Sequence, residues 1–299
     1  MKLPISVPRA KWPDLLTMLP YAELLQVRSD EREYSWSDRE VILYALGVGY
    51  GSDPLNERDL PFVYERSLRV IPTFATVAAW GSNPPLARMK VNYAMVVHGE
   101  QGVTLHEPLP VSGRVMAWGR VVSAIDRGPK GAVVFTETVL RDAVSNSALA
   151  TLNSTIHARA DGGFGGPEGR VTPQQQRPQR APDLTVELPT RGDQALLYRL
   201  LGDRNPLHAD PVAAMAGGFE RPILHGLCTY GLTCRAVLQS FAAGRPESIA
   251  SHHARFAAPV FPGETLMVDL WRNSEIVSFE ARVKERDMVV VKNGRTVLR

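Results

Sequence analysis

The sequence is poor in cysteine, in long apolar runs and in net charge. Only two cysteines occur among its 299 residues, Cys228 and Cys234. On a helix their side chains would point about 240° apart, so the two thiols cannot bond to each other. We therefore expect buried free thiols and a reducing compartment. Glycine or charged residues interrupt the apolar stretches well before the roughly 18 residues of a membrane-spanning helix, which predicts no span.

The small net charge also limits the class of partner. A net charge of +3 is too weak to indicate nucleic-acid binding, although it suits a small ligand that bears phosphate groups. With 44% hydrophobic and 22% charged residues the chain has a globular composition, and its length allows two domains. No apolar signal segment follows Met1, and the end at Arg299 is not a Ser-Lys-Leu type peroxisomal address. We expect a cytoplasmic protein.

The chain consists of two similar halves. In both, a proline leads into an apolar segment and a proline-rich turn follows. The separation from Pro72 to Gly113, 41 positions, equals that from Pro222 to Gly263. An internal duplication is the economical explanation. The glycine-rich stretch 162–166 and the Gln- and Pro-rich residues after it lack apolar periodicity, which is typical of a linker. We predict a first half at 1–160, a linker at 161–182 and a second half at 183–299.

The two halves contain the same kinds of predicted elements. A capping-box pattern precedes an apolar helix in each, Ser37 with Glu40 and Thr190 with Asp193. Apolar residues then follow a helical stripe over 227–241 and alternate with polar ones over 277–283, with similar alternation over 133–140. We predict that each half is a helix wrapped by antiparallel strands, which is an α+β fold.

The segment from Tyr198 to His208, Y-R-L-L-G-D-R-N-P-L-H, contains the strongest chemical pattern. It places the carboxylate of Asp203 and the imidazole of His208 on a short connection between helices, with Gly202 ending the first helix and Asp210 capping the next. Alone, such an aspartate is commonly a turn residue and such a histidine a partner for backbone groups. Together they can hold one water, the minimum needed to add water to a substrate or remove it.

A second element, P-I-L-H-G at 222–226, favours the catalytic interpretation. Gly226 should begin the long buried helix, where free N–H groups stabilise an oxygen that gains negative charge. The simpler alternative is that this glycine only relieves crowding. His225 is more often a structural neighbour than a catalyst. His252 and His253 have no third ligand at metal spacing, so we predict no metal, and no cofactor motif occurs.

These two elements resemble the type 2, (R)-specific enoyl-CoA hydratases of the MaoC-like dehydratase family. Segments along nearly the whole chain are similar to the hydratase region of peroxisomal multifunctional enzyme type 2, among them Y-A-L-G-V-G at 44–49, F-V-Y-E at 62–65, H-G-E-Q at 98–101 and A-R-F at 254–256. The resemblance implies a double hot dog, in which a complete second half supplies catalysis and a degenerate first half shapes the acyl-chain cavity.

The resemblance also implies roles for individual residues. Asp203 and His208 would hold the reacting water, and the N–H of Gly226 would polarise the thioester carbonyl. Asn205 would set the loop, and Glu65 would have a supporting role. The expected acyl-CoA contacts are His98, Gly99, Arg127 and Phe256, with Arg127 where relatives have lysine.

The expected activity is reversible syn hydration of a trans-2-enoyl-CoA to the (R)-3-hydroxyacyl-CoA, in fatty-acid β-oxidation, by a homodimer. Three alternatives stay open at this point. The chain could dehydrate other 3-hydroxyacyl thioesters, on an acyl carrier protein or a steroid side-chain CoA ester. It could be a hot-dog thioesterase, or it could bind acyl-CoA without catalysis. Acyl-chain length is not determined by the sequence.

Overall fold

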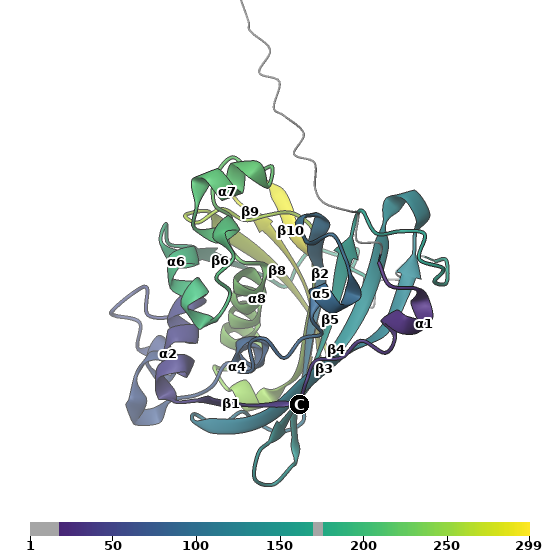
Figure 1. The fold of residues 1–299 in the computed structure, drawn as a ribbon. Helices are drawn as coiled ribbons and strands as arrows, with labels where there is room; N and C mark the ends of the chain where they lie inside the picture. Colours follow the sequence, from purple (N-terminus) through teal and green to yellow (C-terminus); the bar gives the residue numbers. More distant parts are fainter. Residues whose placement is uncertain (1–17, 170–175) are drawn as a thin grey trace, which may run out of the picture.

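A single curved antiparallel sheet organises the molecule (Figure 1). The computed structural model describes residues 18–169 and 176–299, so Met1 lies outside the described residues, as does part of the predicted linker. Ten strands occur in the order β1-β3-β4-β5-β2-β7-β10-β9-β8-β6. Their bounds are β1 Arg32–Trp36, β2 Val96–Leu105, β3 Gly113–Asp126, β4 Ala132–Asp142, β5 Ala148–Ala158, β6 Leu184–Pro189, β7 Ile249–Phe256, β8 Thr265–Asn273, β9 Ile276–Val283 and β10 Met288–Leu298.

The first five strands in space come from the first half and the last five from the second. The halves join where β2 pairs with β7, in a register that sets Glu100 opposite Arg255 and Gly102 opposite His253. Backbone hydrogen bonds therefore continue across the junction, and the two halves form one sheet. The predicted strands at 133–140 and 277–283 lie inside β4 and β9, so both are confirmed.

The helix α8, Gly226–Phe241, lies against the concave side of this sheet (Figure 1). Its side chains from Cys228 to Leu238 are buried, and it contacts strands β6 to β10 and also β2. Leu232 and Val237 are fully buried there. Burial of such a side chain contributes about 1.5–3 kcal/mol, so α8 is the centre of the larger apolar core.

The first half has a much shorter central helix. Its proline-led segment forms the 3-10 helix η3, Pro72–Phe74, and the four-residue helix α4, Ala75–Ala78. The other helices are α1 Tyr21–Leu24, α2 Asp38–Gly47, α3 Leu60–Val63, α5 Leu86–Met89, α6 Gln194–Tyr198 and α7 Pro211–Ala216, with short 3-10 helices such as η1 Glu57–Asp59, η2 Glu65–Ser67, η4 Tyr93–Met95, η5 Gly128–Lys130, η6 Arg199–Leu201, η7 Pro206–His208 and η8 Pro246–Ser248.

Only one of the two predicted capping boxes forms. At α2, Ser37 and Glu40 make both reciprocal contacts. At α6, the N-cap is Asp193 and makes no side-chain cap bond, so that prediction was wrong. Thr190 instead donates its hydroxyl to the carbonyl of Glu264, because the turn before β8 offers a buried acceptor close by.

The glycine-rich stretch is fixed to the first half. The carboxylate of Asp126 accepts hydrogen bonds from the N–H groups of Gly128, Gly163 and Gly165. These bonds lower the pKa of Asp126 despite some burial, which acts in the opposite direction. Gly163 and Gly165 have φ near +79° and +78°, a backbone conformation that favours glycine.

A buried ion pair ties the first half to α8. Arg235 of α8 lies with its Nη2 atom 3.5 Å from the Oδ2 atom of Asp59, and its guanidinium covers the ring of Tyr50 at 4.5 Å. Removing one partner would leave a buried charge unpaired, at a cost of about 3–5 kcal/mol. Cys228 and Cys234 are also buried on this helix and free, as predicted.

Candidate active site

Asp203 and His208 lie on the connection between η6 and α7, where the sequence predicts them. Gly202 ends η6 with φ of 134°, and the side chain of Asp210 caps α7 by accepting the N–H of Val212. Between these ends the chain turns through η7, which contains His208. Both predicted helix boundaries are confirmed.

The acid and the imidazole face each other across a gap. The Nε2 atom of His208 lies 3.9 Å from the Oδ2 atom of Asp203. This distance is too long for a direct hydrogen bond, whereas a water about 2.8 Å from each atom would fit. His208 is buried and Asp203 is partly exposed.

A hydrogen bond determines the tautomer of neutral His208. Its Nδ1 atom lies 2.9 Å from the backbone carbonyl oxygen of Ile223. Because a carbonyl only accepts, Nδ1 carries the proton and Nε2 presents its lone pair to the gap. Burial lowers the pKa of His208, and the Ile223 carbonyl and the Asp203 carboxylate oppose that shift. The imidazole is therefore a proton acceptor near neutral pH.

Asn205 shapes the loop between the two groups. Its backbone N–H donates to the Oδ1 atom of Asp203 at 3.1 Å, and its side-chain oxygen accepts the N–H of Leu207 at 3.0 Å. The first bond fixes the orientation of the carboxylate, and the second caps η7. The side chain thus holds the loop in shape.

His225 is integrated into the site more closely than the sequence indicates. Its ring stacks on that of His208, with centroids 3.7 Å apart and an interplanar angle of 25°. Its Nε2 atom lies 3.3 Å from the backbone carbonyl oxygen of Asp203 and donates to it. Burial lowers the pKa of His225 to about 3, and the neighbouring His208 adds to the shift. A neutral His225 thus supports both members of the pair.

The same three residues could hold a metal ion by distance alone. Asp203, His208 and His225 each offer a ligand atom, and these atoms lie within 4.8 Å of one another. However, in-plane lone pairs of two stacked imidazoles run side by side and do not converge on one point, as metal ligands must. The arrangement therefore fits acid–base chemistry better, and the absence of a metal stays a prediction.

Gly226 is the first residue of α8, directly after His225. Its N–H has no acceptor among the described residues, as expected at a helix start. A Cβ atom here would lie 3.5 Å from the ring of Phe256. This N–H and the helix dipole can stabilise a negatively charged oxygen.

The junction strands supply the next residues. His98 of β2 packs on Phe256 of β7, with ring centroids 5.0 Å apart. Burial lowers the pKa of His98 to about 4, while the hydrogen bond to the Glu100 carbonyl and the charge of Asp203 oppose the shift. Gly99 is required by packing, because a Cβ atom would lie 2.6 Å from the His157 ring. The site thus combines both halves.

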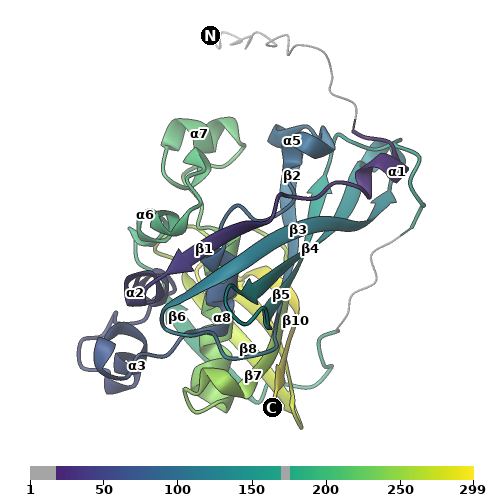
Figure 2. The same cartoon turned by 60° about the horizontal axis from the view of Figure 1, so that its bottom comes forward.

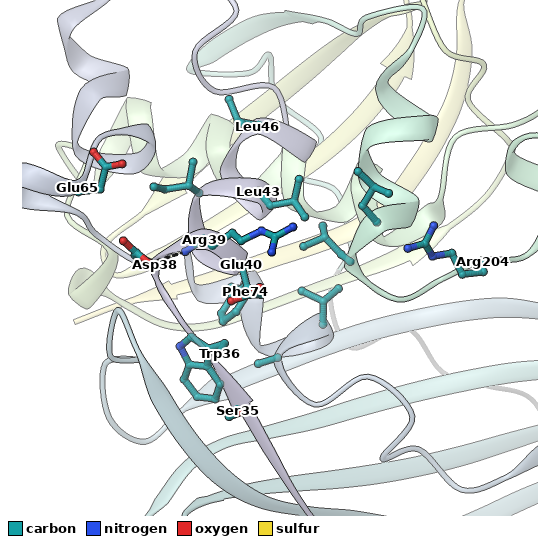
Figure 3. Close-up of a pocket in the computed structure, with 15 residues that line it drawn as sticks. Ser35, Trp36, Asp38, Arg39, Glu40, Leu43, Leu46, Glu65, Phe74 and Arg204 are labelled. Carbon is teal, nitrogen blue, oxygen red and sulfur yellow. Dashed lines mark hydrogen bonds between the residues drawn. The ribbon is translucent and has the colours of Figure 1, made fainter.

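Two predicted residues lie apart from this group. Arg127 is exposed where the hairpin between β3 and β4 begins. Glu65 lines a separate cavity of about 610 Å³ between α2, α4 and η6 (Figure 3). That cavity includes Arg204, the neighbour of Asp203, but neither catalytic candidate. Its apolar lining residues include Leu43, Leu46, Phe74, Val77, Ala78, Leu200 and Leu201.

The fold and this site define a double hot dog with an acid–imidazole pair. The second half matches the MaoC like domain over residues 173–293, and the first half matches the MFE-2 hydratase 2 N-terminal domain over 34–160. The solved structure of a MaoC-like dehydratase from Phytophthora capsici is similar, with a TM-score of 0.82 at 33% identity over 93% of this chain and 98% of that one. A Mycobacterium tuberculosis protein described as a double hot-dog fold shares only the fold, with a TM-score of 0.52 at 14% identity over 94% and 98% of the two chains.

Curated relatives extend the match. The chain is 42% identical over 267 residues to enoyl-CoA hydratase ChsH3 of Mycobacterium tuberculosis, covering 88% of this chain and 92% of that protein. It is 38% identical to peroxisomal multifunctional enzyme type 2 of Drosophila melanogaster over 90% of this chain, but only 45% of that protein is covered. The chain belongs to the MaoC-like dehydratase family and combines its catalytic domain with the MFE-2 hydratase 2 N-terminal domain.

Proposed function

We propose that the protein is an (R)-specific 2-enoyl-CoA hydratase and (3R)-3-hydroxyacyl-CoA dehydratase, a hydro-lyase that adds water reversibly and syn to a trans-2-enoyl-CoA. One observation carries the proposal. The gap of 3.9 Å between Asp203 and His208 has the size for one bridging water, and the pair lies beside the free N–H of Gly226 at the start of α8. Family membership supports the same reaction class.

The pair would activate the water by accepting from it. The carboxylate oxygen of Asp203 and the Nε2 lone pair of His208 are both acceptors, so the water donates one O–H to each and keeps a lone pair free for C3. As oxygen attacks C3, one member of the pair takes a proton. The pair then returns a proton to C2 from the same side, which makes the addition syn.

The Gly226 N–H would act on the thioester oxygen. Attack at C3 moves an electron pair onto that oxygen and produces an enolate-like state, which collapses as C2 is protonated. In the reverse reaction the same group stabilises the state formed when the C2 proton leaves. The stacked, neutral His225 would keep the pair in position throughout.

Substrate contacts follow from the surrounding residues. His98, Gly99 and Phe256 would line the thioester and pantetheine portion, Asn205 would hold the loop, and Arg127 would contact the CoA. The cavity next to Arg204 would accommodate the acyl chain, since most of its lining is apolar. Glu65 would have only a supporting role at the side of this cavity.

A hydration assay tests the proposal. Purified protein is given trans-2-enoyl-CoA esters from four to sixteen carbons, the loss of absorbance of the conjugated thioester is followed, and the product is resolved on a chiral column. We expect the (R)-3-hydroxyacyl-CoA. An (S) product, thiol release without hydration, or binding of the ester without turnover would each contradict the proposal, the last two in favour of a thioesterase or a binding protein.

Three further points belong to this proposal. The domain boundaries are proposed as 1–160, 161–182 and 183–299, because the residues between the halves lack apolar periodicity. A homodimer is proposed because β1 and β6 end the sheet with unpaired edges in the described part of the chain. Light scattering tests this oligomeric state.

A cytoplasmic location is proposed from the two free cysteines. None of the helices in the described ranges is long and apolar enough to cross a bilayer.

A further inference from the structure

Five strand ends meet at one rim of the sheet, beside the proposed site (Figure 2). Strands β3, β5 and β7 end there, while β2 and β4 begin there, because neighbouring strands are antiparallel. His98 lies near the start of β2, and Phe256 is the last residue of β7. A ligand bound at these two residues would therefore lie close to this rim.

Three arginines gather at the rim. Arg159 follows β5, Arg127 follows β3, and Arg255 is near the end of β7. The first two are brought together by packing, since a Cβ atom at Gly131, in the hairpin of Arg127, would lie 2.7 Å from the Cα atom of Arg159. Both are exposed, and neither guanidinium has a hydrogen bond or ion pair within the described ranges.

His157 lies among these charges. It is half-buried and pairs with Val97 of the neighbouring strand. Its ring would lie 2.6 Å from a Cβ atom at Gly99. Its pKa is lowered by burial first and then by the positive charges of Arg255, Arg127 and Arg159. All three guanidinium groups thus act on His157, which lies next to Gly99 of β2.

Three acidic groups nearby are already engaged. Glu100 lies 3.3 Å from the Nε2 atom of His253 and 3.9 Å from Arg255. Asp126 accepts backbone N–H groups of the glycine-rich stretch, and Asp161 accepts the N–H of Asn92. Exposed Glu168 is also near, because its backbone bridges Asp126. Even so, neither Arg127 nor Arg159 has an ion pair among the described residues, which is unusual for two neighbouring cations without an anionic ligand.

Exposed apolar surface borders the cations. Tyr93, which is 68% exposed, and Met95 are the first and last residues of η4, directly before β2. Val97, two residues later, is also exposed. The backbone N–H of Arg159 donates to the carbonyl of Met95, so this apolar surface and the arginines are adjacent. Cations next to an exposed aromatic ring suit a ligand with phosphates and a planar base.

We propose that Arg159 and Arg255, with His157, bind the phosphates at the nucleotide end of CoA, beside Arg127, and that Tyr93 and Met95 face its adenine. This inference rests on the proposed function and deepens it. Arg159, the first residue after β5, is three positions from Ile156, the partner of His98. This corresponds to roughly 10 Å, a span that the pantetheine arm of CoA can cover. The carrier would then be CoA, because the phosphopantetheine of an acyl carrier protein has no nucleotide.

The test compares two thioesters that differ only in the nucleotide end. KM and kcat are measured for trans-2-decenoyl-CoA and for trans-2-decenoyl-pantetheine with the wild type, Arg159→Ala and Arg255→Ala. Loss of one charge-assisted contact should raise KM for the CoA ester roughly 10-fold. The kcat should not change, nor should KM for the pantetheine ester. Arg159→Lys should restore part of the affinity.

Arg58→Ala is the matched control, because Arg58 is exposed, has no ion pair in the described part of the chain, and lies in η1, directly before α3, on the other side of the molecule (Figure 2). An unchanged KM for the CoA ester in both rim variants would overturn the proposal. So would an equal rise in KM for the pantetheine ester, which would indicate a structural role.

A second measurement separates this proposal from the proposed function. Calorimetry with adenosine 3′,5′-bisphosphate needs no turnover. We expect the bisphosphate to bind the wild type and Arg58→Ala equally, and to bind Arg159→Ala roughly 10-fold more weakly. This result would support the phosphate site even if the protein hydrates no enoyl thioester. Absence of binding to the wild type overturns the phosphate site even if hydration is fast.

Discussion

In the second half the 16-residue helix α8 fills the concave side of the strands, whereas the matching segment of the first half forms only η3 and the four-residue α4. The residues after α4 explain the difference. Gly81 has φ of +93°, and Pro84 and Pro85 follow it, so a helix cannot continue. The cavity of about 610 Å³ borders α4, with Val77 and Ala78 in its lining.

The two halves therefore contribute different parts of the proposed site. The long helix provides Gly226 at its start and a rigid support for the loop of Asp203 and His208. The shortened helix leaves space next to that loop. In the proposed function the second half would carry the acid–imidazole pair and the first half would leave room for the acyl chain. The halves are joined by β2 and β7, whose residues His98 and Phe256 pack on each other.

The largest expected effect is on the pair that only the second half has. Asp203→Asn and His208→Gln should each lower kcat by about 10²–10⁴, the usual size of a lost acid–base role. Steady-state kinetics with trans-2-decenoyl-CoA measures this loss. Near-normal turnover in both variants would remove the basis of the proposed mechanism.

Two exposed residues provide controls for that experiment. Asp193→Asn changes a residue of the same half. His106→Gln changes a residue of the first half whose ring bonds Thr151. Both should keep wild-type rates. Circular dichroism of all four variants confirms that the fold is intact.

Filling the space left by the short helix should change substrate choice. Ala78→Phe adds a ring to the wall of the cavity, so kcat/KM for decenoyl-CoA should fall by about 100-fold while crotonyl-CoA is unaffected. A parallel loss on both substrates, or no loss on either, would show that the acyl chain does not enter this cavity. The melting temperature distinguishes this result from a packing defect.

Removing the support of the pair should have a moderate effect. His225→Phe keeps a ring against His208 but loses the hydrogen bond to the carbonyl of Asp203. Loss of one such bond, worth about 1 kcal/mol, should lower kcat by roughly 5-fold to 10-fold. If kcat fell as far as in His208→Gln, His225 would be exchanging protons itself. The pH–rate profile would then lose one titration in His225→Phe.

The smallest effect concerns stability and depends on a histidine buried in the second half. His252 is fully buried between Thr233 and Thr296, and burial lowers its pKa to about 3. An unfolded imidazole titrates near 6.5. Between pH 6.5 and 3 the unfolded state therefore binds more protons, so the free energy of unfolding should fall as the pH is lowered through this range.

Urea unfolding at several pH values measures this slope. Burial also keeps His98 and His225 neutral, and these two residues should add to the effect. A free energy of unfolding that stays constant from pH 7 to pH 4.5 would contradict the prediction.

Local patterns predicted much of the fold because neighbouring residues determine them. The caps at Ser37 and Asp210, the end of η6 at Gly202 and the start of α8 at Gly226 all depend on contacts within a few residues. The second capping box failed for the opposite reason. Thr190 found an acceptor in Glu264, 74 positions away, which no local pattern contains.

The amino-acid sequence by itself determined the duplicated architecture, the acid and imidazole on one turn, and the glycine at a helix start, since each depends on spacing along the chain. Only the tertiary structure decided that His225 stacks on His208, that Glu65 lies in a separate cavity, and that Arg159 joins Arg127 and Arg255 at one rim. These contacts link distant segments through the pairing of β2 with β5 and β7. A pairing of strands depends on the burial of the whole sheet, so spacing along the chain cannot specify it.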